Sequence, residues 1–247
     1  MSIALLEALA ASLQNQEPVA LARVIRSPRP EQIGARAVIW LDRPPQGSLG
    51  LGELEAQALG EAVASLAEGR HRLLRYPDQG IEVFVEVQQR PPRLLIVGAG
   101  HIAVPLCELG ALCDFSVIVI DDRPQFANRS RFPRADKVIA ADIRQTVSAL
   151  AADSETYVVL VTRGHSLDVE CLTTILDRPL PYIGMIGSKR RVRAVFDLLE
   201  REQGIDRAQL ERVHAPIGLA IRAETPAEIA VSIMAQIIAV RRGGRQA

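Results

Sequence analysis

The strongest constraint on the fold is an apolar segment, residues 93–97, that runs directly into Gly98-Ala99-Gly100-His101. A second apolar segment, 115–120, ends in Asp121-Asp122, about 20 residues beyond the glycines, which is the spacing of the dinucleotide fingerprint. A short apolar run before a glycine turn is typical of a buried parallel strand, and the residues after the turn are expected to open a helix. This order predicts the first half of a Rossmann domain.

The residues of this segment have separate expected roles toward a nucleotide-like ligand. Gly98 permits the tight turn, and Gly100 lets the backbone approach a pyrophosphate. The N–H groups from Gly100 to Ile102 lie at the start of the helix, where the positive end of the helix dipole favours an anion. We expect the carboxylate of either Asp121 or Asp122 to accept hydrogen bonds from ribose hydroxyls.

The composition of the 247-residue chain excludes several classes of partner. Its formal charge of zero does not favour nucleic acid or an anionic membrane, and aromatic residues, at 4%, are too few for a base-stacking surface. No segment approaches the roughly 20 apolar residues of a membrane span, and the N-terminus does not resemble a signal peptide, so we expect a cytoplasmic protein. The four histidines and the cysteines at 107, 113 and 171 lack the pattern of a closed metal site, and we expect no metal.

A proline-containing linker, residues 88–92, divides the sequence into two predicted domains, because each proline removes a backbone N–H that a strand needs. We predict a small α+β domain over residues 1–90 and a Rossmann-like nucleotide-binding domain over residues 91–247. In the first domain, the periodicity predicts helices over 3–14 and 53–67 and strands over 18–24, 35–41 and 80–87.

Beyond the linker, strand-like and helix-like segments alternate, which predicts a parallel sheet with helices on both faces. The predicted strands cover 94–97, 115–120, 137–140, 157–161 and 182–186, and the predicted helices cover 101–112, 143–152, 167–177 and 189–203. Thr225-Pro226-Ala227-Glu228 predicts the start of a last helix, since it supplies a hydroxyl N-cap, a proline at the first helical position and a glutamate three residues on.

A second candidate anion site follows the last of these strands. Gly187-Ser188 leads into Lys189-Arg190-Arg191 at the start of a helix, where the helix dipole disfavours positive charge. A bound anion reverses that penalty, and the glycine and the serine suit a phosphate-binding turn. The alternative is a solvated helix face. We therefore name Gly187, Ser188, Lys189 and Arg190 as candidate ligand-binding residues.

Two histidines lie at the predicted carboxyl edge of the sheet. His101 follows the glycine turn, and it either binds the ligand or is an ordinary exposed side chain. His165 lies close to Asp168 after the fourth predicted strand. The two side chains either orient one another, or Asp168 only favours the first turn of its helix.

A set of ordered motifs is similar to those of one known family. The motifs are Gly98-Ala99-Gly100-His101, Val119-Ile120-Asp121-Asp122-Arg123-Pro124 with Phe126 and Arg131-Phe132-Pro133, Tyr182-Ile183-Gly184 with Ile186-Gly187-Ser188, Ala215-Pro216-Ile217-Gly218-Leu219, and 225–233. On these motifs the sequence resembles the XdhC/CoxI family, the xanthine dehydrogenase accessory proteins, over roughly residues 93–242.

The resemblance implies a maturation chaperone rather than an enzyme with turnover of its own. Members of the family bind molybdenum cofactor (molybdopterin), promote its sulfuration with a cysteine desulfurase, and deliver it to apo molybdenum hydroxylases. Applied here, the glycine turn holds the phosphate, or the pyrophosphate of the dinucleotide form. Arg123 joins the candidate cofactor-binding residues, and Ser188 with Lys189 and Arg190 takes a second anionic portion. The apolar stripe of the last predicted helix favours a homodimer.

The N-terminal domain departs from the family pattern at two positions. Glu53 and Asp78 stand where the family commonly has cysteines. Neither a carboxylate nor an amide replaces the soft sulfur of a thiolate as a molybdenum ligand or sulfur acceptor. The departures leave open whether this chain takes part in sulfuration.

Two alternatives from other classes remain. A nicotinamide-dependent oxidoreductase using NAD(P) would have the same fingerprint, with His165 as proton donor and Asp168 as its orienting partner. A nucleotide-sensing regulatory module would use ligand binding to shift a conformational equilibrium.

Overall fold

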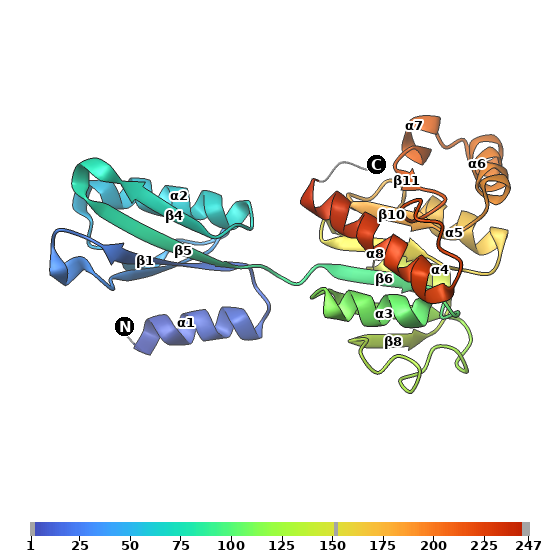
Figure 1. Cartoon of the computed structure of the whole chain (residues 1–247), viewed down its shortest axis with the longest axis horizontal. Helices are drawn as coiled ribbons and strands as arrows, with labels where there is room; N and C mark the ends of the chain where they lie inside the picture. The colour runs from blue at the N-terminus through green and yellow to red at the C-terminus, as the bar shows by residue number, and fades with distance from the viewer. Residues whose placement is uncertain (1–2, 151–152, 244–247) are drawn as a thin grey trace. The chain divides into compact units, whose positions relative to one another are not determined.

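The computed structural model describes residues 3–150 and 153–243, with His165 described by its backbone alone (Figure 1). The chain forms two compact units, one that ends at Arg90 and one that begins at Pro91. Within the described residues, none of the helices combines the length and the apolar character needed to cross a bilayer.

The first unit is an antiparallel sheet with a helix against each face (Figure 1). The sheet order is β3-β2-β1-β5-β4, with β1 Val19–Arg26, β2 Arg36–Ile39, β3 Gln46–Ser48, β4 Arg72–Tyr76 and β5 Ile81–Gln88. Helix α2, Glu55–Ala67, packs Ala58, Ala62 and Leu66 onto one face. Helix α1, Ile3–Gln14, packs Leu5 against β1 and β2 on the other face. The short 3-10 helices are Pro30–Gln32, Gly52–Leu54 and Pro77–Gln79.

The second unit is a parallel sheet of six strands in the order β11-β10-β9-β6-β7-β8. The strands are β6 Arg93–Val97, β7 Ser116–Asp121, β8 Lys137–Ala140, β9 Thr156–Leu160, β10 Tyr182–Met185 and β11 Val213–His214. The helices are α3 Ala103–Leu112, α4 Ile143–Leu150, α5 His165–Ile175, α6 Lys189–Gln203, α7 Arg207–Leu210 and α8 Pro226–Arg242. The predicted Rossmann-like fold class is confirmed.

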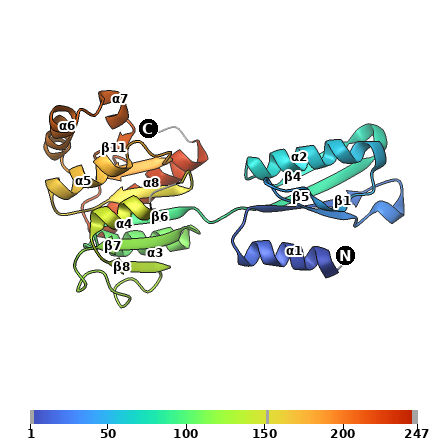
Figure 2. The same cartoon turned by 180° about the vertical axis from the view of Figure 1, so that it is seen from behind.

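Helices cover both faces of this sheet because the strands are apolar on both sides. In β6, Leu94 and Ile96 face the layer that contains α3 and α8, whereas Leu95 and Val97 face the layer of α4, α5 and α6. Figure 1 views the unit from the side of α3 and α8, and Figure 2 views it from the side of α4 and α5. The strand order reverses at β6, so its carboxyl end lies at the topological switch point where such sheets bind ligands.

The predicted start of the last helix is confirmed in detail. The Thr225 side chain accepts from the Glu228 N–H at 3.2 Å, and the Glu228 carboxylate accepts from the Thr225 N–H at 3.0 Å. Pro226 is the first residue of α8. This capping box fixes where α8 begins, next to the carboxyl ends of the strands.

The sequence prediction missed several short elements: β3, β4, β11 and α7. In β4 only Leu74 and Tyr76 are buried, so the apolar alternation is too brief to stand out. Strand β11 has two residues and exists because it pairs with β10. Such elements depend on neighbours that are distant in sequence.

Candidate functional site

A cavity of about 480 Å³ lies at the carboxyl ends of β6, β7 and β9 in the second unit. Its walls come from the glycine turn after β6, the loop after β7, the residues after β9 and the start of α8. The lining residues are Gly100, His101, Ile102, Arg123, Phe126, Val161, Arg163, Glu224, Pro226 and Ile229.

The two glycines of the turn have different structural reasons. Gly98 has a φ of 103°, and a Cβ there would lie 2.6 Å from the Val161 carbonyl oxygen, so the packing of the turn requires glycine. A Cβ on Gly100 would meet nothing within 4 Å. The protein itself does not require glycine at position 100. Close approach of a ligand does give a reason for it.

The start of α3 offers donors to this cavity. Its N-cap residue, Ile102, has no side-chain cap, and the N–H groups of Gly100, His101 and Ile102 donate to no group in the described part of the chain. Four N–H groups at the start of any helix lack partners within that helix, and the helix dipole adds a partial positive charge there. An anion at this end of the cavity would satisfy these donors.

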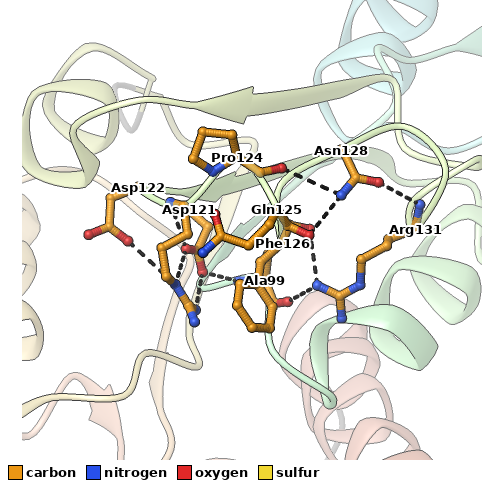
Figure 3. Close-up of polar contacts among 9 residues, drawn as sticks. Ala99, Asp121, Asp122, Pro124, Gln125, Phe126, Asn128 and Arg131 are labelled. Atoms are coloured by element: carbon orange, nitrogen blue, oxygen red, sulfur yellow. Dashed lines mark hydrogen bonds and ion pairs between the residues drawn. The ribbon is translucent and has the colours of Figure 1, made fainter.

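The structure gives the Asp121 carboxylate partners within the protein rather than leaving it free for a ribose. It is 1% exposed and accepts from the Ala99 N–H at 2.7 Å (Figure 3). Arg123 donates three further bonds, from its backbone N–H at 3.1 Å, Nε at 2.7 Å and Nη2 at 2.8 Å. Asp121 therefore ties the loop after β7 to the glycine turn. Asp122 is 52% exposed at its side chain and is the accessible member of the pair.

The electrostatics of Asp121 follow from these bonds. Burial alone raises the pKa of a carboxyl group, but the hydrogen bonds from Arg123 and Ala99 outweigh it and hold the pKa of Asp121 below its ordinary value. The carboxylate is therefore ionised at neutral pH and remains bound to the guanidinium.

Phe126 and two arginines fix the loop that follows β7. The Arg123 guanidinium lies over the Phe126 ring, 3.9 Å from its centre, and Arg131 lies 5.1 Å from it. Arg131 Nη1 donates to the carbonyl oxygens of Ala99 at 2.8 Å and Phe126 at 3.0 Å (Figure 3). The Asn128 side chain donates to the Gln125 carbonyl at 2.9 Å. The loop is thus bound to the glycine turn at several points.

The second predicted cluster does not line this cavity. Ser188 is the N-cap of α6, accepting from the Arg191 N–H at 3.2 Å, and Lys189 and Arg190 are exposed. A Cβ on Gly187 would touch the Arg191 side chain. The anion-binding role of Gly187, Ser188, Lys189 and Arg190 remains a prediction.

Asp168 has partners that the sequence did not suggest. It is fully buried and accepts hydrogen bonds from Thr162 Oγ1 and Arg191 Nη2. One oxygen of this carboxylate therefore binds the segment after β9 and the other binds helix α6, which locks the ends of two strands together. The side chain of His165 lies outside the described residues.

Sequence reasoning missed Arg163, Phe126 and Glu224 as cavity residues. Arg163 follows β9 at the carboxyl edge, which is a usable signal in a parallel sheet. Glu224 reaches the cavity only because α8 folds back against α3. Its position about 120 residues beyond the fingerprint gives no local indication.

The first unit has a separate cavity of about 450 Å³. Glu53 and Gln79 both line it, so the two segments that depart from the family pattern meet there, with Asp78 next to Gln79. Glu55 holds the glycine-rich loop by accepting from the N–H groups of Leu49 at 3.0 Å and Leu51 at 3.2 Å. Neither cavity is lined by a cysteine.

The three cysteines are free, and two of them are fully buried. Burial raises the pKa of Cys107 to about 11 and that of Cys171 to about 12, so neither is a thiolate at neutral pH. In residues 3–150 and 153–243, no three His, Cys, Asp or Glu side chains are grouped to hold a metal ion.

Comparison with known proteins gives two family matches. A model of the XdhC Rossmann domain matches residues 94–237, and a model of the XdhC and CoxI family matches residues 12–77. The Escherichia coli K12 protein called uncharacterized protein YqeB is 30% identical, covering 94% of this chain and 45% of that protein. A Bacillus subtilis protein, described as one of the probable subunits of xanthine dehydrogenase, is 34% identical, covering 67% of this chain and 48% of that protein. The chain spans about half the length of both relatives.

The fold also matches a solved structure. A crystal structure of a xanthine dehydrogenase from Bacillus halodurans superposes with a TM-score of 0.57 and 23% identity, covering 97% of this chain and 96% of that chain. This likeness establishes a shared fold.

Proposed function

Because the chain belongs to the XdhC and CoxI family, we propose that it is an accessory protein in the maturation of a molybdenum hydroxylase of the xanthine dehydrogenase type. The Bacillus subtilis relative, whose description places it with xanthine dehydrogenase, supports this context. In this role the chain binds molybdenum cofactor or a related phosphorylated ligand and delivers it to the apoenzyme. It needs no turnover of its own.

The observation that carries the ligand assignment is the open glycine turn. Three N–H groups at the start of α3 lack partners in the described chain, and the space beside Gly100 is empty. A phosphate group of the pterin cofactor fits these donors. When bound, the cofactor supplies the molybdenum chemistry of the client enzyme, whereas His101, Arg123 and the turn only hold and release it.

Sulfuration of the cofactor does not use a thiol of the two cavities in this proposal. The positions of the family cysteines carry Glu53 and Asp78, and the buried thiols of Cys107 and Cys171 are protonated. A cysteine desulfurase that acts with this protein would therefore pass sulfur to the cofactor without an intermediate on a thiol of either cavity.

The test is the pterin content of the protein purified from a host that makes molybdenum cofactor. The protein is denatured, the released material is oxidised, and pterin fluorescence is measured. We expect about one pterin per chain in the wild type and a loss of at least about tenfold in Gly100→Leu, whose side chain fills the space that the phosphate needs.

Gly60→Leu in α2 is the matched control, since a side chain there also meets nothing within 4 Å. It should retain the pterin. Unchanged pterin in Gly100→Leu would exclude the glycine turn as the binding site. A wild type without pterin would exclude the carrier role.

An NAD(P)-dependent oxidoreductase is the second candidate, favoured by the same turn and the same switch-point position. Oxidation of NADH or NADPH in the presence of a panel of carbonyl substrates would support it. A pterin-containing protein without such oxidation would favour the accessory role.

A further inference from the structure

The carboxylate that should bind a ribose in a Rossmann domain already has two parallel donors. In the dinucleotide fingerprint, an acid after the second strand accepts from the ribose hydroxyls. Here that acid is Asp121, and Arg123 Nε and Nη2 donate to its two oxygens at 2.7 and 2.8 Å. The planar guanidinium presents two adjacent N–H groups to a carboxylate, much as a ribose presents two adjacent hydroxyls.

Arg123 is held firmly in this position. Its side chain is 16% exposed, its guanidinium packs on the Phe126 ring, and its backbone N–H also donates to Asp121. Arg123 also lines the 480 Å³ cavity beside Gly100 and Ile102. A ribose at this position must displace a charge-assisted pair with two hydrogen bonds, which costs more than the neutral hydroxyl bonds return.

We propose that Arg123 is a specificity-determining residue that occupies the diol-binding position of Asp121 and so selects against ligands that carry a free ribose there. This inference rests on the proposed ligand site at the glycine turn. The favoured ligand has a phosphate for the N–H groups of Gly100 to Ile102 and no ribose at the end of β7. Of the two forms of the pterin cofactor, this is the form that ends in a phosphate monoester, not the dinucleotide.

The test uses two probes that differ only in the diol, ADP and 2′,3′-dideoxy-ADP, with binding measured by calorimetry. The wild type should bind both with the same affinity or bind neither. Arg123→Met keeps an apolar chain on Phe126 and frees the Asp121 carboxylate. This variant should bind ADP at least about tenfold more tightly than the wild type does and at least about tenfold more tightly than dideoxy-ADP, because hydroxyls then donate to a charged acceptor.

Arg134→Met is the matched control. Arg134 belongs to the same loop, is 55% exposed at its side chain, pairs with Glu108 and does not line the cavity. It should leave both affinities unchanged. Arg123→Lys is a second variant that keeps a cation beside Asp121 for folding but loses the paired donors, and it should show a smaller gain for ADP.

Two outcomes would overturn the inference. One is a wild type that already prefers ADP over dideoxy-ADP, as it would if Asp122 bound the diol. The other is a folded Arg123→Met protein, and a folded Arg123→Lys protein, without any gain for ADP. Pterin content in the same preparations judges the proposed function separately, so a protein that keeps its pterin but fails the ADP test refutes the role of Arg123 alone.

Discussion

At the scale of single residues, the second unit depends on two buried carboxylates, each bound by an arginine. Asp121 is held by Arg123, and Asp168 is held by Arg191 and Thr162. A buried charge without a partner is costly, so each arginine is needed for as long as its carboxylate stays ionised. The pairs also join segments that meet at the carboxyl edge of the sheet.

The Asp168 pair gives a prediction at this scale. Arg191→Met should lower the free energy of unfolding by about 3 kcal/mol, since it leaves a fully buried carboxylate without its cation. Urea denaturation followed by circular dichroism measures the loss. Arg190→Met, on the exposed neighbouring residue, should change stability by less than about 0.5 kcal/mol. Equal effects of the two substitutions would contradict the assigned role.

At the scale of elements, the turn between β6 and α3 combines a packing constraint with an open surface. Gly98 lies against the backbone after β9 and donates its N–H to the Ile120 carbonyl at 2.8 Å. Gly100, two residues later, borders open space. The first glycine holds the turn between neighbouring strands, and the second leaves room at the helix start.

This difference predicts opposite outcomes for the same substitution. Gly98→Ala should cost about 2–3 kcal/mol of stability, because the added Cβ meets the Val161 carbonyl and the φ of 103° disfavours a side chain. Gly100→Ala should change stability by less than about 0.5 kcal/mol. Thermal and urea denaturation of both variants measures this. A strongly destabilised Gly100→Ala would show that its glycine serves the fold rather than a ligand.

At the scale of the whole molecule, helix α8 has apolar residues on two sides. Ile233 and Ile237 are buried against the sheet layer, whereas Val231 and Ile238 are 48% and 39% exposed. Exposed apolar side chains on one helix face commonly mark a protein interface. The homodimer expected from the sequence is therefore a proposal that this face can test.

We expect the wild type to have the mass of a dimer by light scattering, and Val231→Lys/Ile238→Lys to have that of a monomer. Two lysines in a tightly packed apolar interface would leave buried charges without partners. Leu6→Lys/Leu13→Lys on α1 changes two residues of similar exposure, 45% and 47%, and should leave the mass unchanged. A monomeric wild type would refute the dimer.

Much of the fold could be predicted because its signals are local. The apolar strand before Gly98, the alternation of strands and helices, and the cap at Thr225 all follow from short-range periodicity and backbone chemistry. The elements that escaped prediction, such as the two-residue β11, have too few residues to produce a period. They form because a neighbouring strand supplies the pairing.

The sequence by itself determined the class of fold, the position of the glycine turn and the family. Only the tertiary structure decided how the charged side chains pair. With 29 basic and 29 acidic residues in the chain, spacing alone cannot assign a partner to Asp121 or Asp168. Those pairings depend on which ends of strands lie side by side and on which carboxylates become buried. The same physical reason places Glu224 at a cavity that begins at Gly100, since packing of α8 against α3 is a long-range contact.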